Sequence, residues 1–147
     1  MKISAKGRYA LLAVMELAAE RRRGGRAMRI QQIASRRQVP PRYLVQILLQ
    51  LNKAGIVGSV RGARGGYTLT RHPSDISVGQ VLTAIEGPLW TSQCLEGEIP
   101  PECRGFTVCP FKDVWLRISS AVSRIVDAVS FADVTALVQD EPVMYHI

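Results

Sequence analysis

The sequence predicts a mainly α-helical chain with one small β-hairpin, arranged as a winged helix-turn-helix followed by a long dimerisation helix. Three observations indicate this fold: three helical stretches before residue 55, two short β-prone runs around a basic glycine-rich segment, and an amphipathic stretch that begins at Phe111. With 147 residues and 47% hydrophobic content, the chain can bury one compact core with an extension for oligomerisation.

The first three predicted helices contain the helix-turn-helix. Ser4 is of a residue type that caps helices, and the first helix ends at the basic turn of residues 21–25. A second helix over residues 30–39 stops at a proline pair, because proline lacks an amide hydrogen and restricts the residue before it. Pro41, the second of the pair, suits the first position of a third helix, which Gly55 ends. The core-facing positions of this third helix are Leu44, Ile47, Leu48 and Leu51.

A basic hairpin is predicted next and forms the wing. Residues 56–60 and 67–70 are β-prone, and the segment between them, residues 61–66, is rich in arginine and glycine. Because glycine tolerates positive φ, this segment suits a flexible tip that approaches a partner closely. Ser77 then begins a capping-box pattern for a fourth helix, which Gly87 ends.

The stretch from Phe111 onward carries an apolar seam whose steps alternate between four and three residues, as a coiled coil requires. The seam positions are Phe111, Trp115, Ile118, Val122, Ile125 and Val129. We expect this face to join two copies in a homodimer, because two-fold dimers are common and match palindromic DNA; packing on the chain's own N-terminal domain is the alternative. Ser130 is expected to cap a short last helix. The predicted organisation is a winged-helix DNA-binding domain over residues 1–87, a cysteine loop over 88–110, a dimerisation helix and short C-terminal helix over 111–138, and a tail over 139–147.

Charge is divided unevenly along the chain. Residues 1–72 hold 15 Lys and Arg against two acids, an excess of +13, whereas residues 73–147 hold four against ten, or −6. This asymmetry is typical of a nucleic-acid-binding module joined to a regulatory half. A solvated basic surface without a polyanion partner is the alternative, in which the excess charges would repel one another.

All three cysteines, Cys94, Cys103 and Cys109, lie in the turn-rich loop before the amphipathic stretch. Soft thiolates suit iron-sulfur clusters, zinc and copper(I), so the loop is interpreted as a sensor or cofactor loop; the alternative is that the cysteines are small apolar core residues. The odd count and the lack of an apolar signal segment argue against a disulfide framework and favour a reducing cytoplasm. No apolar run approaches the ~20 residues of a membrane span, so a soluble protein is expected.

The sequence offers no catalytic constellation, neither a Ser-His-Asp set nor paired carboxylates in an evident pocket. Residues 62–66 are not a nucleotide-binding loop, because they join two predicted strands and open no helix. We therefore expect no enzymatic activity.

Several segments, in this order and spacing, form a specific combination: residues 4–10, residues 30–34, Tyr43 and Leu44 with residues 51–57, residues 60–67, and three cysteines before Trp115. Together they resemble the Rrf2 family of bacterial transcription regulators. The resemblance implies a homodimer of winged helices, with the long helix after the cysteines crossing between subunits. It also implies a cluster, [2Fe-2S] or [4Fe-4S], bound by Cys94, Cys103 and Cys109, whose occupancy or redox state changes DNA affinity.

The cysteine loop departs from the family pattern. Eight residues separate Cys94 from Cys103 and five separate Cys103 from Cys109, whereas cluster-binding relatives space their cysteines more evenly. Lys112 stands where one group of relatives has a histidine, and Arg8 stands where another draws an acid from the partner subunit. The fourth ligand is therefore unassigned, and an exchangeable one would leave an iron open to a signal.

The residues expected to contact double-stranded DNA fall into three groups. In a winged helix, the start of the third helix enters the major groove, where Arg42 can pair with guanine and Gln46 with adenine. Wing arginines suit a narrow minor groove, and other basic residues contact phosphates without reading sequence. The recognition-helix candidates are Pro41, Arg42, Tyr43 and Gln46; the wing candidates are Ser59, Arg61, Gly62, Arg64, Gly65 and Gly66; the phosphate candidates are Lys2, Lys6, Arg8, Arg36 and Arg37.

The expected function is that of a cytoplasmic, dimeric transcription regulator whose affinity for a palindromic operator is controlled by an iron-sulfur cluster that senses redox state, nitric oxide or iron supply. One alternative is a regulator of the same family that uses its thiols, without a cluster, as a disulfide or zinc switch. Another is an iron-sulfur carrier whose basic half serves a different polyanion.

Overall fold

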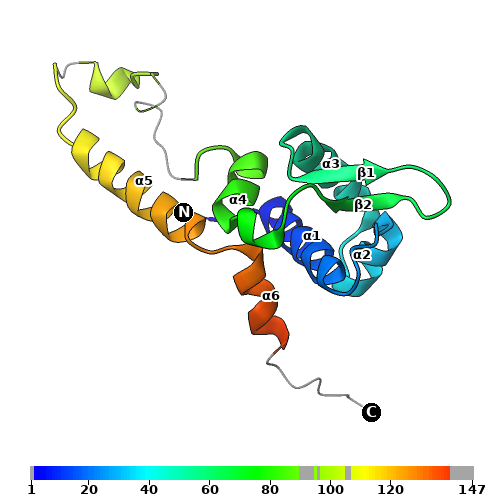
Figure 1. The fold of residues 1–147 in the computed structure, drawn as a ribbon. Helices are drawn as coiled ribbons and strands as arrows, with labels where there is room; N and C mark the ends of the chain where they lie inside the picture. The colour runs from blue at the N-terminus through cyan, green and yellow to red at the C-terminus, as the bar shows by residue number, and fades with distance from the viewer. Residues whose placement is uncertain (1, 90–94, 96, 105–106, 140–147) are drawn as a thin grey trace, which may run out of the picture.

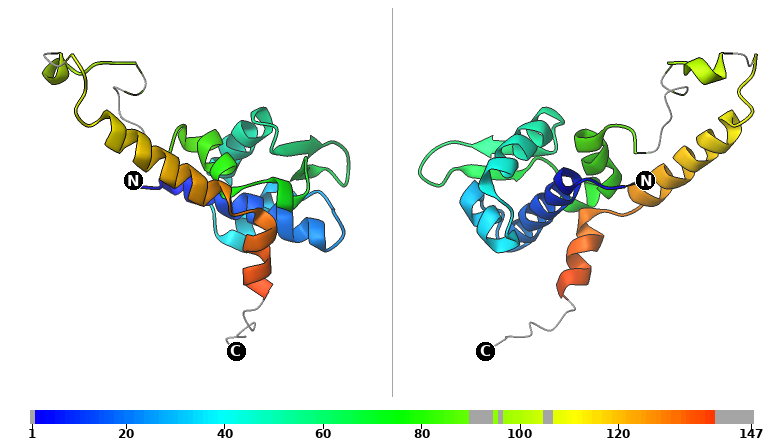
Figure 2. Two further views of the ribbon diagram at one scale, coloured as in Figure 1. Left: turned by 60° about the vertical axis from the view of Figure 1, so that its left-hand side comes forward. Right: turned by 180° about the vertical axis from the view of Figure 1, so that it is seen from behind.

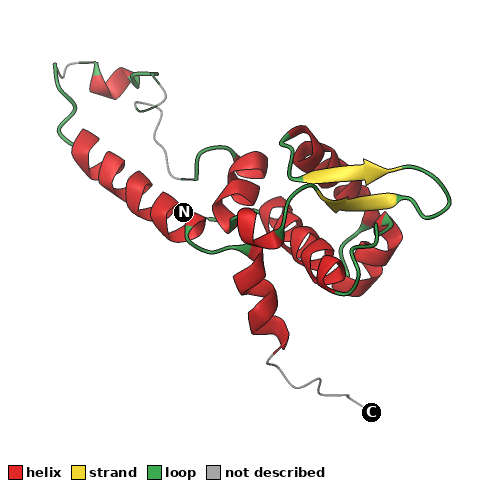
Figure 3. Cartoon of the chain, viewed as in Figure 1, coloured by secondary structure: helices red, strands yellow, loops and turns green. Residues whose placement is uncertain are grey.

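The computed structural model describes residues 2–89, 95, 97–104 and 107–139, and within them the chain forms six α-helices and one two-stranded sheet (Figure 1). Cys94 and residues 140–147 of the predicted tail lie outside the described residues. The elements are α1 (Ala5–Arg22), α2 (Ile30–Arg37), α3 (Pro41–Lys53), β1 (Val57–Val60), β2 (Gly66–Leu69), α4 (Val78–Glu86), α5 (Lys112–Asp127) and α6 (Phe131–Gln139), with short 3-10 turns η1 (Pro73–Asp75) and η2 (Pro101–Cys103). The prediction of a mainly helical fold with one small hairpin is confirmed (Figure 3).

The first helix begins where the sequence predicted and is held there by the end of α4. The Ser4 hydroxyl accepts a hydrogen bond from the Gly7 amide at 3.0 Å, which confirms Ser4 as the N-cap. In turn, the Glu86 carboxylate accepts from the Ser4 amide at 3.1 Å and from its hydroxyl at 2.6 Å. The start of α1 is thereby tied to the last residue of α4.

The helix-turn-helix consists of α2, a tight turn and α3. Helix α2 ends at Arg37, two residues before the predicted end, because Gln38 adopts the left-handed conformation with φ 52° and its amide bonds to Ala34. Helix α3 begins at Pro41 as predicted. The four core-facing residues predicted for α3 are each completely buried: Leu44, Ile47, Leu48 and Leu51.

The wing is an antiparallel hairpin in which Val57 lies opposite Leu69 and Val60 opposite Gly66. One feature was not predicted: Met28, in the α1–α2 connection, pairs with Tyr67 through two backbone hydrogen bonds of 2.9 and 2.8 Å. A single bridged residue has no periodic pattern that a sequence could reveal. The end of β2 nearest the tip of the wing is therefore fixed to the segment that precedes α2.

Helix α5 projects from the body of the molecule, as all views in Figures 1 and 2 show, and each of its residues stays at least partly exposed. Its C-terminal end is anchored: the Val78 amide donates to the Val129 carbonyl at 2.9 Å, and the Phe131 amide to the Ile76 carbonyl at 3.0 Å. Phe131 fills the base of the main core, where it is 1% exposed. The core thus holds the C-terminal end of α5, while the rest of this helix extends away from the body of the molecule.

Ser130 caps α6, as predicted. Its hydroxyl and its amide donate to the Asp133 carboxylate at 2.6 and 2.9 Å, and the Asp133 amide donates back to the hydroxyl at 3.2 Å. These hydrogen bonds lower the pKa of Asp133 from its ordinary value of 3.8, and the bond from the Ser130 hydroxyl has the largest effect. The cap therefore contributes stability above that pH and loses it as the pH falls through the lowered pKa.

Gly87→Ala is expected to destabilise the fold by about 1 kcal/mol, because Gly87 ends α4 with φ 80° and a side chain strains that backbone. No atom lies within 4 Å of an added Cβ, so the cost is conformational. Urea unfolding measures it. Gly58→Ala is the matched control, since its Cβ would make an ordinary 3.6 Å contact with Thr70; equal stability of the two variants would contradict the prediction.

Candidate functional site

The exposed face of α3 presents the predicted recognition residues. Pro41, Arg42, Tyr43 and Gln46 are all exposed, and Arg42 and Gln46 lie on the side of the helix opposite its buried face. The Arg42 guanidinium lies 5.0 Å from the centroid of the Tyr43 ring, a cation–π contact that limits its freedom. The Tyr43 ring in turn lies 6.0 Å from that of Tyr9 in α1. The start of α3 is therefore an ordered, basic and aromatic surface.

The wing presents a second basic surface. Ser59, Arg61, Gly62 and Arg64 are exposed, whereas Gly65 and Gly66 are half-buried. The tip folds through a hydrogen bond of 2.9 Å from the Gly65 amide to the Gly62 carbonyl. Both wing arginines are thus available to a partner that lies along the hairpin.

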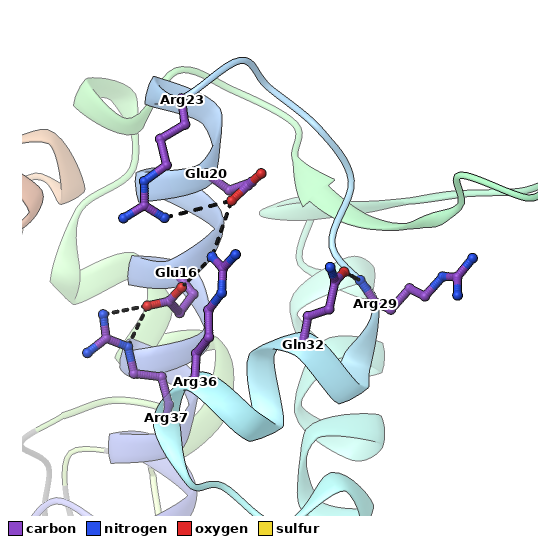
Figure 4. A network of polar contacts seen from close by, with 7 residues as sticks. All are labelled: Glu16, Glu20, Arg23, Arg29, Gln32, Arg36 and Arg37. Atoms are coloured by element: carbon purple, nitrogen blue, oxygen red, sulfur yellow. Dashed lines mark hydrogen bonds and ion pairs between the residues drawn. The ribbon is translucent and has the colours of Figure 1, made fainter.

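The predicted phosphate contacts lie in two different environments. Lys2 and Arg8 are exposed and Lys6 is half-buried near the start of α1. Arg36 and Arg37, by contrast, are held by carboxylates of α1 in the network drawn in Figure 4.

That network joins α2 to α1. Arg36 contacts Glu16 at 3.3 Å and Glu20 at 3.2 Å, and the Arg37 Nε donates to Glu16 at 2.6 Å. Hydrogen bonds with Glu16 and then Glu20 raise the pKa of Arg36. Glu16 is buried, with 6% of its side chain exposed, so its charge is compensated by the two arginines. The sequence contained a signal for this network that was missed: the two acids of residues 1–72 are spaced four apart on one helix face.

The cysteine loop brings two of its three thiols to one hollow. Cys103 and Cys109, both half-buried, line a hollow of about 360 Å³ together with Val108, Phe111 and Lys112. Among the residues that the structure describes, no three His, Cys, Asp or Glu side chains lie close enough to hold a metal ion. Two soft sulfur donors on one apolar hollow fit a thiolate-bound metal or cluster, and further ligands would come from beyond the described set, which excludes Cys94.

The predicted dimer seam is largely uncovered by its own chain. Phe111, Ile125 and Val129 are exposed, with 68% of Ile125 accessible. The three central positions, Trp115, Ile118 and Val122, are half-buried. The end positions flank α5 rather than lie in it, since the helix begins at Lys112 and ends at Asp127. An apolar stripe of this length on an outlying helix is typical of an association surface.

Comparison with known proteins identifies the family. The sequence model of Rrf2, described as an iron-dependent transcriptional regulator, matches residues 3–137. The chain belongs to the Rrf2 family. This confirms the resemblance drawn from the sequence, and the family is one of transcriptional regulators.

Rrf2 relatives match almost the full chain. The HTH-type transcriptional regulator CymR of Bacillus subtilis is 34% identical over 99% of this chain and 97% of its own length. The HTH-type transcriptional regulator IscR of Aliivibrio salmonicida is 35% identical over 90% of this chain and 76% of its own length. The solved structure of CymR, the global cysteine regulator of B. subtilis, matches with a TM-score of 0.75 and 33% identity, covering 93% of this chain and 98% of that one.

These Rrf2 comparisons confirm the winged-helix fold class. Both relatives are named as regulators of transcription, in keeping with a chain for which no enzymatic activity was predicted. No helix among the described residues has the length and apolar character needed to cross a membrane.

Proposed function

We propose that this Rrf2-family regulator is a cytoplasmic homodimer whose affinity for a palindromic operator in double-stranded DNA is set by an iron-sulfur cluster, [2Fe-2S] or [4Fe-4S], held by Cys94, Cys103 and Cys109. The observation that carries the proposal is that Cys103 and Cys109 line one hollow at the head of α5. The family description as iron-dependent and the similarity to IscR support it. Bound there, the cluster would supply a redox-active centre at the start of the proposed dimerisation helix.

A chain of contacts supports control of DNA affinity from this loop. The Cys109 carbonyl accepts a hydrogen bond of 3.3 Å from the first residue of α5. At its other end, α5 leads to Val129, which bonds to Val78 in α4. The last residue of α4, Glu86, holds Ser4 at the start of α1, beside the basic residues expected to touch phosphate. A shift of the loop can thus reach the DNA-binding face through α5, whose C-terminal end is anchored beside α4, and through α4, which holds the start of α1.

Anaerobic purification after iron-replete expression tests the proposal. We expect a coloured protein with matching iron and acid-labile sulfide, and loss of both in Cys103→Ser and in Cys109→Ser. Val108→Ala is the matched control, because it alters the same hollow without removing a thiol, and it should retain iron. A colourless wild-type protein that holds zinc or reduced thiols would contradict the cluster and leave the DNA-binding role standing.

A second candidate is a regulator that switches through its thiols without a cluster, as a disulfide or with zinc. The placement of Cys103 and Cys109 on one hollow and the similarity to the cysteine regulator CymR favour it. Oxidant-dependent operator binding by metal-free protein would support this candidate over the first. An iron-sulfur carrier, the third possibility, predicts no sequence preference in DNA, so a sharp footprint on a palindrome would exclude it.

A further inference from the structure

A basic hollow lies between the α1–α2 turn and the wing. It has a volume of about 560 Å³, and Arg26, Arg29 and Arg64 are among the described residues that line it, with no carboxylate among them. Figure 4 shows that Arg29 points away from the Glu16 and Glu20 cluster. The three arginines therefore face one space without the acidic partners that neutralise the arginines of α2.

The backbone of Arg29 is fixed beside the end of β2 nearest the tip of the wing. Its amide donates to the Gln32 side chain at 2.8 Å, which closes the N-terminus of α2. The preceding residue, Met28, is paired with Tyr67 of β2. Gly66 packs directly against the Met28 carbonyl, where an added Cβ would collide with the backbone. Arg29 thus starts from a point that moves with both α2 and the hairpin.

The side chain of Arg29 reaches from this point to the loop at the tip of the wing. Its Nη2 donates to the Ala63 carbonyl at 2.7 Å, a short bond with a charged donor. Ala63 lies between Arg61 and Arg64, the two arginines expected to enter the minor groove. This hydrogen bond, called the Arg29 strut below, holds the tip of the wing at a fixed position relative to the start of α2.

We propose that Arg29 is a positioning residue that sets the DNA specificity of the wing, an inference that rests on the proposed operator binding. Helix α2 packs against α3, so the strut fixes the wing tip relative to the recognition helix. It thereby sets where Arg61 and Arg64 meet the DNA once Arg42 is seated in the major groove. Narrow A·T-rich minor grooves attract guanidinium groups through shape and potential rather than base contacts, and such discrimination needs a tip held in place.

Loss of the hydrogen bond from Arg29 to Ala63 should change DNA binding differently from loss of an arginine charge alone. A loosened tip still attracts phosphates, so general affinity persists while the preference for a narrow groove declines. Removal of an arginine that only attracts phosphate weakens binding to all sequences alike and reduces its salt dependence. Arg26 is the matched control, because it lines the same hollow and is exposed.

The test uses the full-length protein and the duplex that the wild type selects from a random pool. Binding is compared between this duplex and versions with either the A·T flank changed to G·C or the major-groove half-site changed. In Arg29→Ala we expect flank discrimination to fall on the order of tenfold, half-site discrimination to persist, and amide exchange of residues 61–65 to accelerate. Arg26→Ala should keep discrimination and exchange unchanged, and Arg29→Lys, which can still donate one hydrogen bond, should restore part of both.

Unchanged flank discrimination and unchanged wing exchange in Arg29→Ala would overturn the proposal. If Arg29→Ala does not fold, Arg29→Met, which keeps an aliphatic side chain but cannot donate to the Ala63 carbonyl, carries the test, and wild-type discrimination together with wild-type exchange in that variant would overturn it. A wild-type protein that selects no sequence at all would instead contradict the proposed operator binding. The two failures are therefore distinguishable.

Discussion

Ile125→Glu is expected to convert the protein to a monomer and to lower its operator affinity by between about 10² and 10⁴ fold. The side chain is 68% exposed in a single chain and lies in the predicted seam of α5, so a dimer would bury it against its partner. A carboxylate at that position would lose its hydration without a compensating charge. Two linked half-sites gain affinity from their high effective concentration, and a monomer forfeits that gain.

Analytical ultracentrifugation and operator titration measure the two effects together. Ser123→Glu is the matched control, because it adds the same charge to an exposed position of the same helix outside the seam. Since Ile125 contributes little to the core of one chain, the helical content of the monomer should equal that of the wild type. A dimeric Ile125→Glu protein with unchanged affinity would contradict assembly through this face.

Local signals in the sequence predicted the winged helix well. The Ser4 cap, the start of α3 at Pro41 and the buried leucines of α3 all follow from backbone chemistry and helical periodicity, which need no knowledge of tertiary contacts. The end of α2 was placed two residues late because Gln38 adopts a left-handed conformation without being glycine. Asparagine, aspartate and glycine are the residue types that usually adopt the left-handed conformation, so glutamine gave no signal that the helix ends here.

The sequence predicted correctly those candidate site residues that need only to be exposed on one face of a helix. Arg42 and Gln46 are exposed because they lie opposite a buried face, and periodicity determines this. The contacts of Arg36 and Arg29, by contrast, are made with residues of other elements. Arg36 binds Glu16 in α1, 20 residues away in the sequence, and Arg29 binds Ala63 in the wing, 34 residues away. The sequence alone does not show which partner a basic residue will contact in the folded chain.

Glu16→Gln is expected to destabilise the fold by about 2 kcal/mol. Removal of one member of a fully buried ion pair costs roughly 3–5 kcal/mol, because a charge is left uncompensated. Here Glu16 is buried, but the Arg36 and Arg37 side chains it leaves behind are 42% and 29% exposed, so water recovers part of that loss. Unfolding in urea measures the change. Glu20→Gln, in a position 18% exposed, removes the same charge and keeps the Glu16 pairs, so it should cost less than about 1 kcal/mol.

The same substitution tests whether Arg36 and Arg37 can serve DNA phosphates. With Glu16 neutral, Arg37 loses its carboxylate partner and Arg36 keeps only Glu20, on a surface whose net charge rises by one. Affinity for non-specific duplex DNA should then increase, and its dependence on salt should steepen by about one phosphate contact. Glu20→Gln adds an equal charge but leaves Arg37 with Glu16, which separates release of the arginines from the charge itself. If Glu16→Gln and Glu20→Gln bind DNA with the same salt dependence, the network has a structural role and the two arginines of α2 are not held back from the phosphates by Glu16.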